Sequence, residues 1–411
     1  MDTATSAITL PTEREDPLDP PRRLEAVRSE APIQRLSFTD GHVGWLVTSH
    51  TLARSILGDK RISVRDSMER SPVDNRARRE AFDRLAASGN RRVASRFAGN
   101  FLNMDPPDHT KFRRMLAGEF TPAKMEELRP RIVAIVAEHA DQLLRHGPPV
   151  DLVEGYSLPI PSLTICELLG VPTDVRAAFH GYSTIIDDPA TDPDDLAAAY
   201  GGFTELMYRL AEDEEIRASD TLLGRLAGHG DLTIDDVVGV SILLVAAGHQ
   251  TVANMLAMSV YALLVQRHRW ESLVADPAAI PNAVEELLRF ITTFQLGALT
   301  RTATEDIVVD AVTIKAGESI TVSLPAANRD PERFEYADSL DLSRHAAGHV
   351  AFGHGIHVCL GQHLARIELE IALGCLVERF PTLDLAISAD EVPMHPGHES
   401  QAGPAELPVT W

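Results

Sequence analysis

The residues best suited to chemistry in this 411-residue chain lie in one segment near its C-terminus. From Phe352 to Gly361, three glycines surround a single cysteine, Cys359, and a helical pattern follows directly. A cysteine at a helix N-terminus faces backbone N–H groups and the positive end of the helix dipole, which both favour its thiolate form. A thiolate with small neighbours, which a flat macrocycle can approach, suits the axial ligand of a haem iron. The alternative is a buried structural cysteine, the more common state of an isolated one.

The same segment resembles the haem-binding loop of the cytochrome P450 family, Phe-Gly-x-Gly-x-His/Arg-x-Cys-x-Gly. The chain matches every fixed position of that loop with Phe352, Gly353, Gly355, His357, Cys359 and Gly361. The resemblance covers residues 32–407 and is to the soluble bacterial, actinomycete-like members. It implies a mainly α fold with small β-sheets, in which a long central helix crosses a haem b and a β-rich corner lies near the N-terminus. Cys359 would bind the iron.

The resemblance also implies that four basic residues hold the two haem propionates. They are His109, Arg113, Arg301 and His357. Arginine and histidine side chains form charge-assisted hydrogen bonds with carboxylates. His109 and Arg113 are four residues apart, so a helix would place both on one face. Without the haem loop, each would more simply be a surface residue.

Glu286 and Arg289 match the Glu-x-x-Arg pair that braces the haem loop in this family. The spacing places both side chains on one helix face. The motif is weak by itself, because it recurs at Glu25/Arg28, Glu126/Arg129 and Glu214/Arg217. In the family an arginine from the following meander completes the group, and either Arg333 or Arg344 could do so here. We expect these residues to give structural support.

The resemblance places oxygen activation on the long apolar helix, in the segment that the family writes Ala/Gly-Gly-x-acid-Thr. The expected catalytic residues are Gly248, Gln250 and Thr251. Gly248 would leave space for dioxygen, and the Thr251 hydroxyl can relay protons because it both donates and accepts hydrogen bonds. The alternative for Thr251 is a hydrogen bond to the carbonyl four residues earlier. Both roles are compatible, because that bond would loosen the helix where oxygen binds.

Gln250 departs from the family pattern, which has a carboxylic acid at this position. An amide does not titrate, so proton delivery would need water chains, His249 or groups of the substrate. This departure keeps desaturation, ring formation and coupling open beside ordinary hydroxylation. Since Thr251 is retained, we still expect oxygen activation.

By the same resemblance, the substrate cavity is lined by the long helix and by residues 62–100, 165–200 and 292–299. The candidate substrate contacts are Ala247, Thr292, Thr293, Phe294 and Leu296.

The segments beside this cavity have opposite charge. Residues 59–96 carry eleven basic and six acidic side chains, whereas residues 187–236 carry three basic and fourteen acidic ones. The simpler interpretation is two solvated lids that attract each other. The alternative is that the basic segment steers an anionic substrate or an acidic carrier protein towards the cavity.

The patterning predicts which elements position these residues. Residues 33–38 and 44–49 read as a hairpin, and Ser49 as the cap of a helix that reaches residue 57. Helical patterning dominates residues 107–265, with breaks at Pro130, residues 148–149, residues 159–161 and Pro172. Within it, the long helix begins at Thr233 with a capping box.

Further helices are predicted over residues 281–290 and 360–379, and strands over residues 307–327, with a proline-rich meander over residues 328–349. We expect residues 1–31 to be a flexible leader and residues 32–411 to form a single domain.

The composition limits the partners and the compartment. A net charge of −22 argues against nucleic-acid binding, because phosphates attract cationic surfaces. The apolar runs 237–248 and 252–265 are each shorter than the roughly 20 residues that a membrane span needs, and no signal peptide is visible. The other two cysteines, Cys166 and Cys375, lie in apolar helical patterns, and three cysteines suit a reducing cytoplasm. We expect a cytoplasmic monomer.

The leading hypothesis is therefore a haem-thiolate monooxygenase that oxidises a small organic molecule in secondary, antibiotic-type metabolism. The sequence contains no flavin domain, NAD fingerprint or iron–sulfur cysteine set. The resemblance implies that electrons come from NAD(P)H through a ferredoxin reductase and a ferredoxin, with Lys111 and Arg114 as docking residues. The alternatives are a haem-binding scaffold without turnover and a peroxide-driven peroxygenase.

Overall fold

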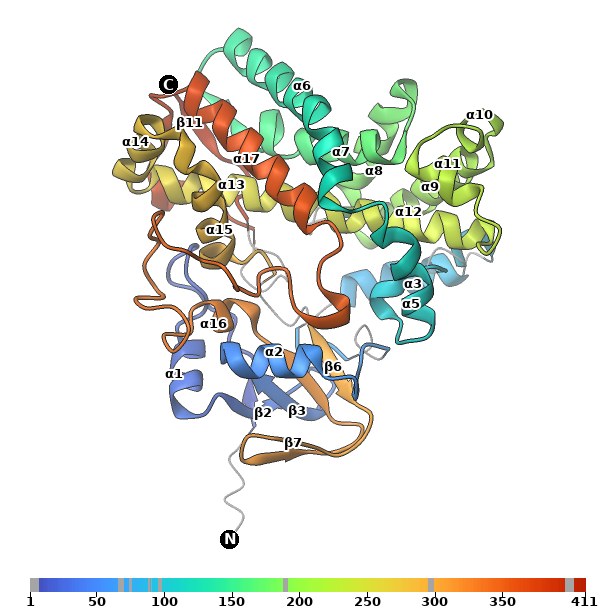
Figure 1. Ribbon diagram of the computed structural model, residues 1–411, viewed down its shortest axis with the longest axis vertical. Coiled ribbons are helices and arrows are strands. Elements are labelled where there is room, and N and C mark those ends of the chain that lie inside the picture. Colours follow the sequence, from blue (N-terminus) through green and yellow to red (C-terminus); the bar gives the residue numbers. More distant parts are fainter. Residues whose placement is uncertain are drawn as a thin grey trace.

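The computed structural model describes residues 7–65, 70–73, 76–87, 89, 91–94, 98–187, 191–294, 299–395 and 403–411. Figure 1 shows a large helical body that contains the C-terminus and, at the other end of the molecule, a β-rich corner near the N-terminus. This arrangement confirms the expected mainly α fold with small sheets.

A six-stranded sheet forms the β-rich corner, in the spatial order β1-β2-β3-β9-β6-β4. Its strands are β1 (Ile8–Thr9), β2 (Ile33–Ser37), β3 (Val43–Val47), β9 (Ser319–Val322), β6 (Thr300–Ala303) and β4 (Ile62–Ser63). The predicted hairpin is confirmed, because β2 and β3 pair antiparallel with Ile33 opposite Val47. Ser49 then caps α2 (His50–Gly58) by accepting a hydrogen bond from the Leu52 N–H, as expected.

The expected flexible leader is wrong for its described part. Strand β1 pairs with β2, and α1 (Arg23–Glu30) buries Leu24 and Val27. These two side chains join an apolar cluster with Leu36 and Leu46 of the hairpin. Burial of apolar side chains on the sheet thus orders a segment whose composition is polar and proline-rich.

The helical body contains most of the remaining chain. Its helices are α3 (Arg76–Ala87), α4 (Arg91–Ala94), α5 (Asp108–Ala117), α6 (Pro122–His146), α7 (Pro159–Leu169), α8 (Arg176–Asp187), α9 (Pro193–Glu212), α10 (Glu214–Arg217), α11 (Leu222–Ala227), α12 (Ile234–Gly248), α13 (Gln250–Leu264), α14 (Arg267–Ala275), α15 (Ile280–Ile291), α16 (Leu324–Asn328) and α17 (Gln362–Arg379). A three-stranded sheet of β10 (Asp384–Leu385), β11 (Pro408–Thr410) and β5 (Val150–Asp151) and the hairpin of β7 (Ile307–Val309) and β8 (Val312–Ile314) complete the fold.

The break predicted at Pro130 is wrong, because α6 continues through this residue. A proline inside a helix removes one backbone hydrogen bond. Packing outweighs this loss: α6 buries Met125, Ile132 and Val136, and it lies along α17.

The predicted long helix is two helices, α12 and α13, which meet at His249. Thr233 forms the expected capping box with Asp236 at its start. By length and composition alone, the run Ile234–Leu264 could cross a membrane. It lies in the core instead, where nearly every side chain of α13 is buried, and such a core helix passes the same test.

Candidate active site

An internal cavity of about 340 Å³ lies where α7, α12, α13 and α17 meet the loop before α17. Many of the residues that the sequence singled out line it together: Arg113, Ala247, Gly248, Thr251, Thr293, Phe294, Arg301, Phe352, Gly353, His357, Cys359 and Gly361. They come from segments up to 248 residues apart, which the fold brings to one wall.

Cys359 turns its side chain into this cavity, two residues before Gly361, which caps α17. The thiol is accessible from the space of the cavity. Burial raises the pKa of the Cys359 thiol, whereas the backbone N–H of Gly361 and the charges of Arg113 and Arg366 lower it. A metal ion bound to sulfur would remove the thiol proton outright, so these donors suit a metal-bound thiolate.

The four expected propionate-binding residues lie together in one group, called the cationic cluster here after its two arginines. The rings of His109 and His357 lie 4.2 Å apart between centroids. Arg113 donates a hydrogen bond to the carbonyl of Val358 at 2.7 Å, which ties α5 to the cysteine loop. Arg301 is 9% exposed and also lines the cavity, whereas His109 lies behind His357 and is not part of the wall.

These groups have unmet hydrogen-bonding capacity. Among the described residues, His109 Nε2 and both ring nitrogens of His357 find no hydrogen-bond partner. Burial, with the neighbouring charges of His109 and Arg301, lowers the pKa of His357 to about 3. Burial likewise lowers the pKa of Arg301 to about 10. An anion in the cavity would satisfy these donors, so the wall fits the carboxylates of a haem.

Dioxygen needs free space beside the Thr251 hydroxyl. Gly248 and Thr251 lie on the cavity wall at the junction of α12 and α13. A Cβ atom at Gly248 would lie 3.4 Å from the Ile165 side chain, an ordinary van der Waals contact, so Gly248 leaves a space that a methyl group would fill. Thr251 Oγ1 donates a hydrogen bond to the Ala247 carbonyl at 2.7 Å. This is the back-bond expected as one of its two roles.

Gln250 does not line the cavity. Its Nε2 atom donates a hydrogen bond to Asn254 Oδ1 at 3.0 Å, one turn along α13. The residue that replaces the usual acid is therefore engaged with a neutral amide.

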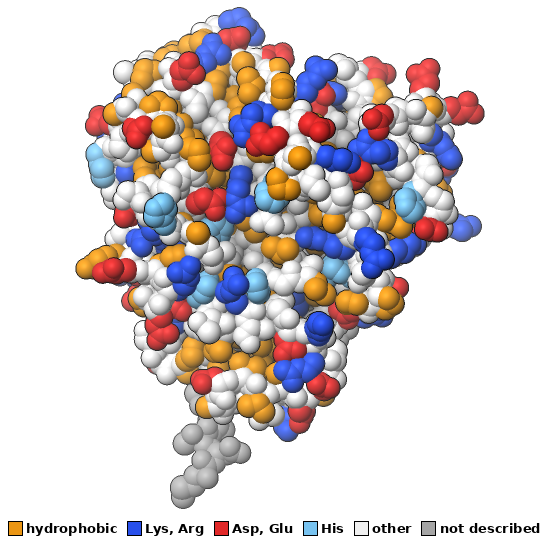
Figure 2. All heavy atoms as spheres, viewed as in Figure 1, with side chains coloured by type: hydrophobic (Ala, Val, Ile, Leu, Met, Phe, Trp, Pro, Cys, Tyr) orange, Lys and Arg blue, Asp and Glu red, His pale blue; other side chains and the backbone are white. Residues whose placement is uncertain are grey.

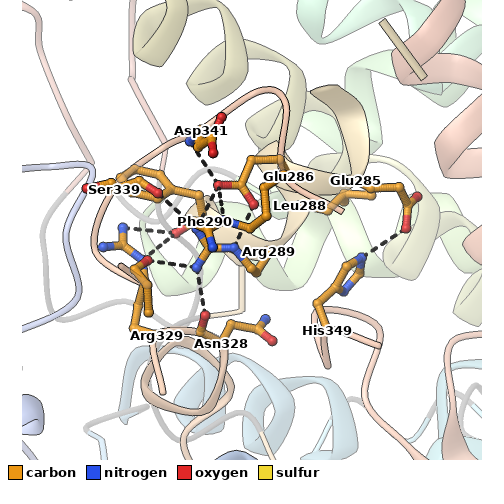
Figure 3. A network of polar contacts seen from close by, with 12 residues as sticks. Glu285, Glu286, Leu288, Arg289, Phe290, Asn328, Arg329, Ser339, Asp341 and His349 are labelled. Atoms are coloured by element: carbon orange, nitrogen blue, oxygen red, sulfur yellow. Dashed lines mark hydrogen bonds and ion pairs between the residues drawn. The ribbon is translucent and has the colours of Figure 1, made fainter. Parts of the chain in front are cut away.

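The Glu286–Arg289 pair is fully buried and bidentate, with nitrogen–oxygen distances of 2.7 and 2.8 Å (Figure 3). Arg289 also donates to the backbone carbonyls of Asn328 and Ala337. The third member is Arg344, whose Nε atom lies 3.1 Å from Glu286 Oε1.

The open choice between two arginines is thus decided, because Arg333 donates instead to the Ala347 carbonyl.

Two of the expected substrate contacts are not placed in the cavity. Thr292 is fully buried, and its hydroxyl bonds to the Leu288 and Arg289 carbonyls and accepts from Asn328, so it caps α15. Sequence pattern alone does not distinguish Thr292 from the adjacent Thr293 and Phe294, which do line the wall. Leu296 lies outside the described residues, as does part of the expected wall at 62–100.

The oppositely charged segments face each other. Arg84 of α3 pairs with Asp194 of α9, and Arg92 of α4 pairs with Glu205 and Glu212 of α9 at 3.2 and 2.7 Å. These contacts confirm that the two segments attract each other.

Glu368 is a cavity residue that the sequence reasoning missed. It projects from α17, is 3% exposed, and its Oε2 atom has no hydrogen-bond partner among the described residues. Burial raises the pKa of its carboxyl group to about 8. The sequence contains one sign of this position, because Glu368 is an acid among the apolar residues of the last helix.

Comparison with known proteins identifies the family of the chain. The family model "Cytochrome P450" matches residues 279–397. Cytochrome P450 105C1 of a Streptomyces species is 38% identical over 100% of both chains, and pentalenic acid synthase of Streptomyces avermitilis is 40% identical over 100% of this chain and 99% of that one. The crystal structure of P450 MoxA from Nonomuraea recticatena superposes with a TM-score of 0.87 at 37% identity, over 99% of each chain. With a cysteine loop, a cationic wall and relatives of this similarity over its whole length, the chain belongs to the cytochrome P450 family.

Proposed function

We propose that this protein is a haem-thiolate monooxygenase that activates dioxygen to hydroxylate or otherwise oxidise a small organic molecule, with Cys359 as the iron ligand. The carrying observation is that the Cys359 thiol, the buried cationic cluster and Thr251 share one internal cavity. When bound, the haem supplies oxygen chemistry at an iron whose thiolate ligand favours O–O cleavage.

In this proposal, the cationic cluster binds and orients the cofactor. Arg113, Arg301 and His357 donate to the propionates from the cavity wall, and His109 supports His357 from behind. Gly353 and Gly361 place no side chain beside Cys359, so a macrocycle can approach the sulfur, and Phe352 contributes its ring to the wall. The two propionate carboxylates would accept charge-assisted hydrogen bonds from these donors.

Thr251 would hold and move the proton that oxygen activation consumes. Its Oγ1 atom can release the Ala247 carbonyl and donate into the cavity, then take up a proton from water. Gln250 cannot supply that proton. Delivery therefore passes through water in the cavity or through the buried His249, beside the helix break.

The substrate in this proposal is a small, mainly apolar molecule of secondary metabolism. Leu243, Leu244, Val252 and Phe294 give the cavity an apolar wall, with Ala247 and Thr293 as further contacts. Two relatives are named pentalenic acid synthase and nocardicin C N-oxygenase, which supports this class. Because Arg84 and Arg92 are paired with acids of α9, we favour lid attraction over steering of an anionic or carrier-bound substrate.

An atypical oxidation is the second candidate, supported by Gln250 in place of the usual acid. A solved structure with a TM-score of 0.86 and 32% identity is described as the putative thioether synthase SgvP. Its fold is closely similar to this one, so the same scaffold is compatible with chemistry other than hydroxylation.

Electrons would come from NAD(P)H through a ferredoxin reductase and a ferredoxin, in the cytoplasm, to a monomer with one P450 domain. Lys111 and Arg114 are exposed on α5 and line an open depression with Pro106, Pro107 and Thr110. Figure 2 shows further Lys and Arg side chains across the middle of the same face, over α2 and α5. An acidic ferredoxin would fit this surface.

The absorption spectrum of the purified protein tests the proposal. We expect the dithionite-reduced carbon monoxide complex to show the strongly red-shifted Soret band of a thiolate ligand. The Cys359→Ser variant should lose this band, whereas Cys375→Ala should keep it. An unshifted band in the wild type would overturn the assignment of Cys359. A shifted band without substrate-dependent oxygen consumption would instead favour the scaffold.

A further inference from the structure

Two consecutive glutamates of α15 hold different parts of the haem surroundings. Glu286 faces the meander, whereas Glu285 points to the opposite side, towards His349 (Figure 3). The His349 Nε2 atom lies 3.3 Å from Glu285 Oε2. The same carboxylate receives a bidentate contact from Arg366 of α17, with Nη2 at 3.2 Å from Oε2. Glu285 thus joins α15, the loop before the cysteine and α17.

Both partners of Glu285 pack on the ring of Phe352. The Arg366 guanidinium carbon lies 4.6 Å from the ring centroid, a cation–π distance. The His349 ring centroid lies 6.0 Å away, with the two planes inclined by 43°. The His349 Nδ1 atom accepts the Ala351 N–H, so its proton sits on Nε2, the atom that faces Glu285. The Phe352 ring therefore packs against two groups that both contact one carboxylate, Arg366 by hydrogen bonds and His349 by a 3.3 Å approach.

Phe352 is directly connected to the expected iron ligand. Its carbonyl accepts the Cys359 backbone N–H at 2.9 Å, and both side chains line the cavity. Groups around a cysteine sulfur set the electron density that it donates, by exclusion of water and by local charge.

We propose that Glu285 is a positioning residue for the thiolate: by orienting His349 and Arg366, it fixes the Phe352 ring beside Cys359 and thereby sets the reduction potential of the iron. This inference rests on the proposed ligation by Cys359. Among the described residues, loss of the carboxylate would leave Arg366 with only its hydrogen bonds to Gln362 and His349 with only the Ala351 N–H, so both would pack less firmly on Phe352 and admit water near the sulfur. Donation to iron would weaken, and the reduced state would become more favourable.

The test is the Glu285→Gln variant as the haem-loaded enzyme. We expect a more positive potential, with an equilibrium constant for reduction at least about threefold larger, or about 28 mV by the one-electron relation. Part of the reduced carbon monoxide complex should also lose the thiolate-type Soret band. The matched control is Glu370→Gln, because Glu370 is likewise partly exposed and paired with an arginine, Arg129. The proposal is overturned if Glu285→Gln has the potential and spectrum of the wild type.

A double-mutant cycle separates positioning from a simple charge effect. Phe352→Leu removes the ring that Glu285 is proposed to hold. If Glu285 acts through this ring, Glu285→Gln should change the potential little in the Phe352→Leu background. Equal shifts in both backgrounds would show a direct field effect and contradict the positioning role.

Two measurements keep the result decisive. If Glu285→Gln fails to retain haem, Arg366→Lys tests the same contact, because it keeps the charge and loses the planar stacking on Phe352. A wild-type potential in Arg366→Lys would overturn the proposal. The wild-type carbon monoxide spectrum is read first: an unshifted band there refutes Cys359 ligation itself, whereas a normal band with unaffected variants refutes only the role of Glu285.

Discussion

At the scale of single residues, the hydrogen bonds of Thr251 and Gln250 decide what each side chain can contribute to the cavity. Thr251 is engaged with the carbonyl of Ala247, yet its side chain stays on the cavity wall. Gln250 contributes no titratable group beside it. In the proposed function, Thr251 is therefore the hydroxyl at this junction of helices that passes the proton on from water or His249.

Removing that hydroxyl should separate oxygen consumption from product formation. For Thr251→Ala we expect product per oxygen consumed to fall by about tenfold or more, since a positioned proton donor contributes at least this much. Thr251→Ser keeps a hydroxyl and should stay close to the wild type. Hydrogen peroxide release and oxygen uptake measure the ratio. Equal coupling in Thr251→Ala and wild type would exclude the relay.

Glu368 predicts a dependence of stability on pH. Its pKa is about 8 in the folded chain against an ordinary value of 4.5, so the folded state holds the proton more tightly than the unfolded state. This group therefore stabilises fully below pH 4.5, and its contribution is lost as the pH rises towards 8. The loss is up to about 1.4 kcal/mol per pH unit.

In Glu368→Gln that pH dependence should disappear. We expect the difference in unfolding midpoint between variant and wild-type holoenzyme to favour the variant increasingly from pH 5 to pH 8. Glu378→Gln, an exposed site on the same helix, is the matched control. Parallel pH profiles for Glu368→Gln and wild type would contradict the buried, proton-bearing carboxyl group.

At the scale of elements, ion pairs connect the two segments beside the cavity. Arg92 of α4 bridges Glu205 and Glu212 of α9, and its guanidinium lies 4.7 Å from the ring of Tyr208. The paired side chains are about 40% exposed, so each pair is weak and salt-sensitive. A weak contact between elements is suited to opening and closing rather than to holding the fold together.

Charge reversal at Arg92 should therefore open the entrance. For Arg92→Glu we expect association of an azole ligand with the haem iron to become about two- to fivefold faster at low salt, since exposed pairs contribute up to about 1 kcal/mol. Added salt should accelerate the wild type towards the variant. Stopped-flow absorbance gives both rates, with Arg131→Glu on α6 as the control. A wild-type rate that ignores salt would argue against a lid held by charge.

At the scale of the whole molecule, the charge is strongly acidic in sum and locally basic over α5. A net charge of −22 would repel an acidic protein, so docking requires a local cationic surface. Lys111 and Arg114 lie on the same helix as Arg113, which bonds to the carbonyl before Cys359. This helix therefore joins the proposed docking surface to the cysteine loop.

Reversing both charges, in Lys111→Glu/Arg114→Glu, should slow reduction by a ferredoxin about tenfold at low ionic strength and less at high salt. Arg23→Glu/Arg217→Glu makes the same change in net charge on α1 and α10 and should leave the rate unchanged. The measurement is the rate of the first electron transfer under carbon monoxide. Equal rates for the two double variants would reject this surface.

The sequence by itself determined the elements whose signals are local. The cysteine loop, the Glu286–Arg289 pair, the hairpin after residue 32 and the capping box at Thr233 depend on neighbours a few residues away. Short-range hydrogen bonds and steric limits act on these in any context. For this reason the cysteine loop was identified from its residues and spacing, and the resemblance that this loop carries led to the other predicted residues of the cavity wall.

Only the tertiary structure decided the features that depend on packing between distant segments. Burial against α17 keeps α6 helical through Pro130, and contact with the sheet orders α1. Arg344, and not Arg333, contacts Glu286. Both residues are arginines, so only the path of the meander decides which of them reaches the carboxylate.

Packing also decides two side chains near the site: Thr292, expected in the cavity, closes the end of α15, and Glu368, which the sequence did not single out, lines the cavity. A local sequence pattern does not predict which face of a buried helix lines a cavity. The packing of the whole chain determines that face.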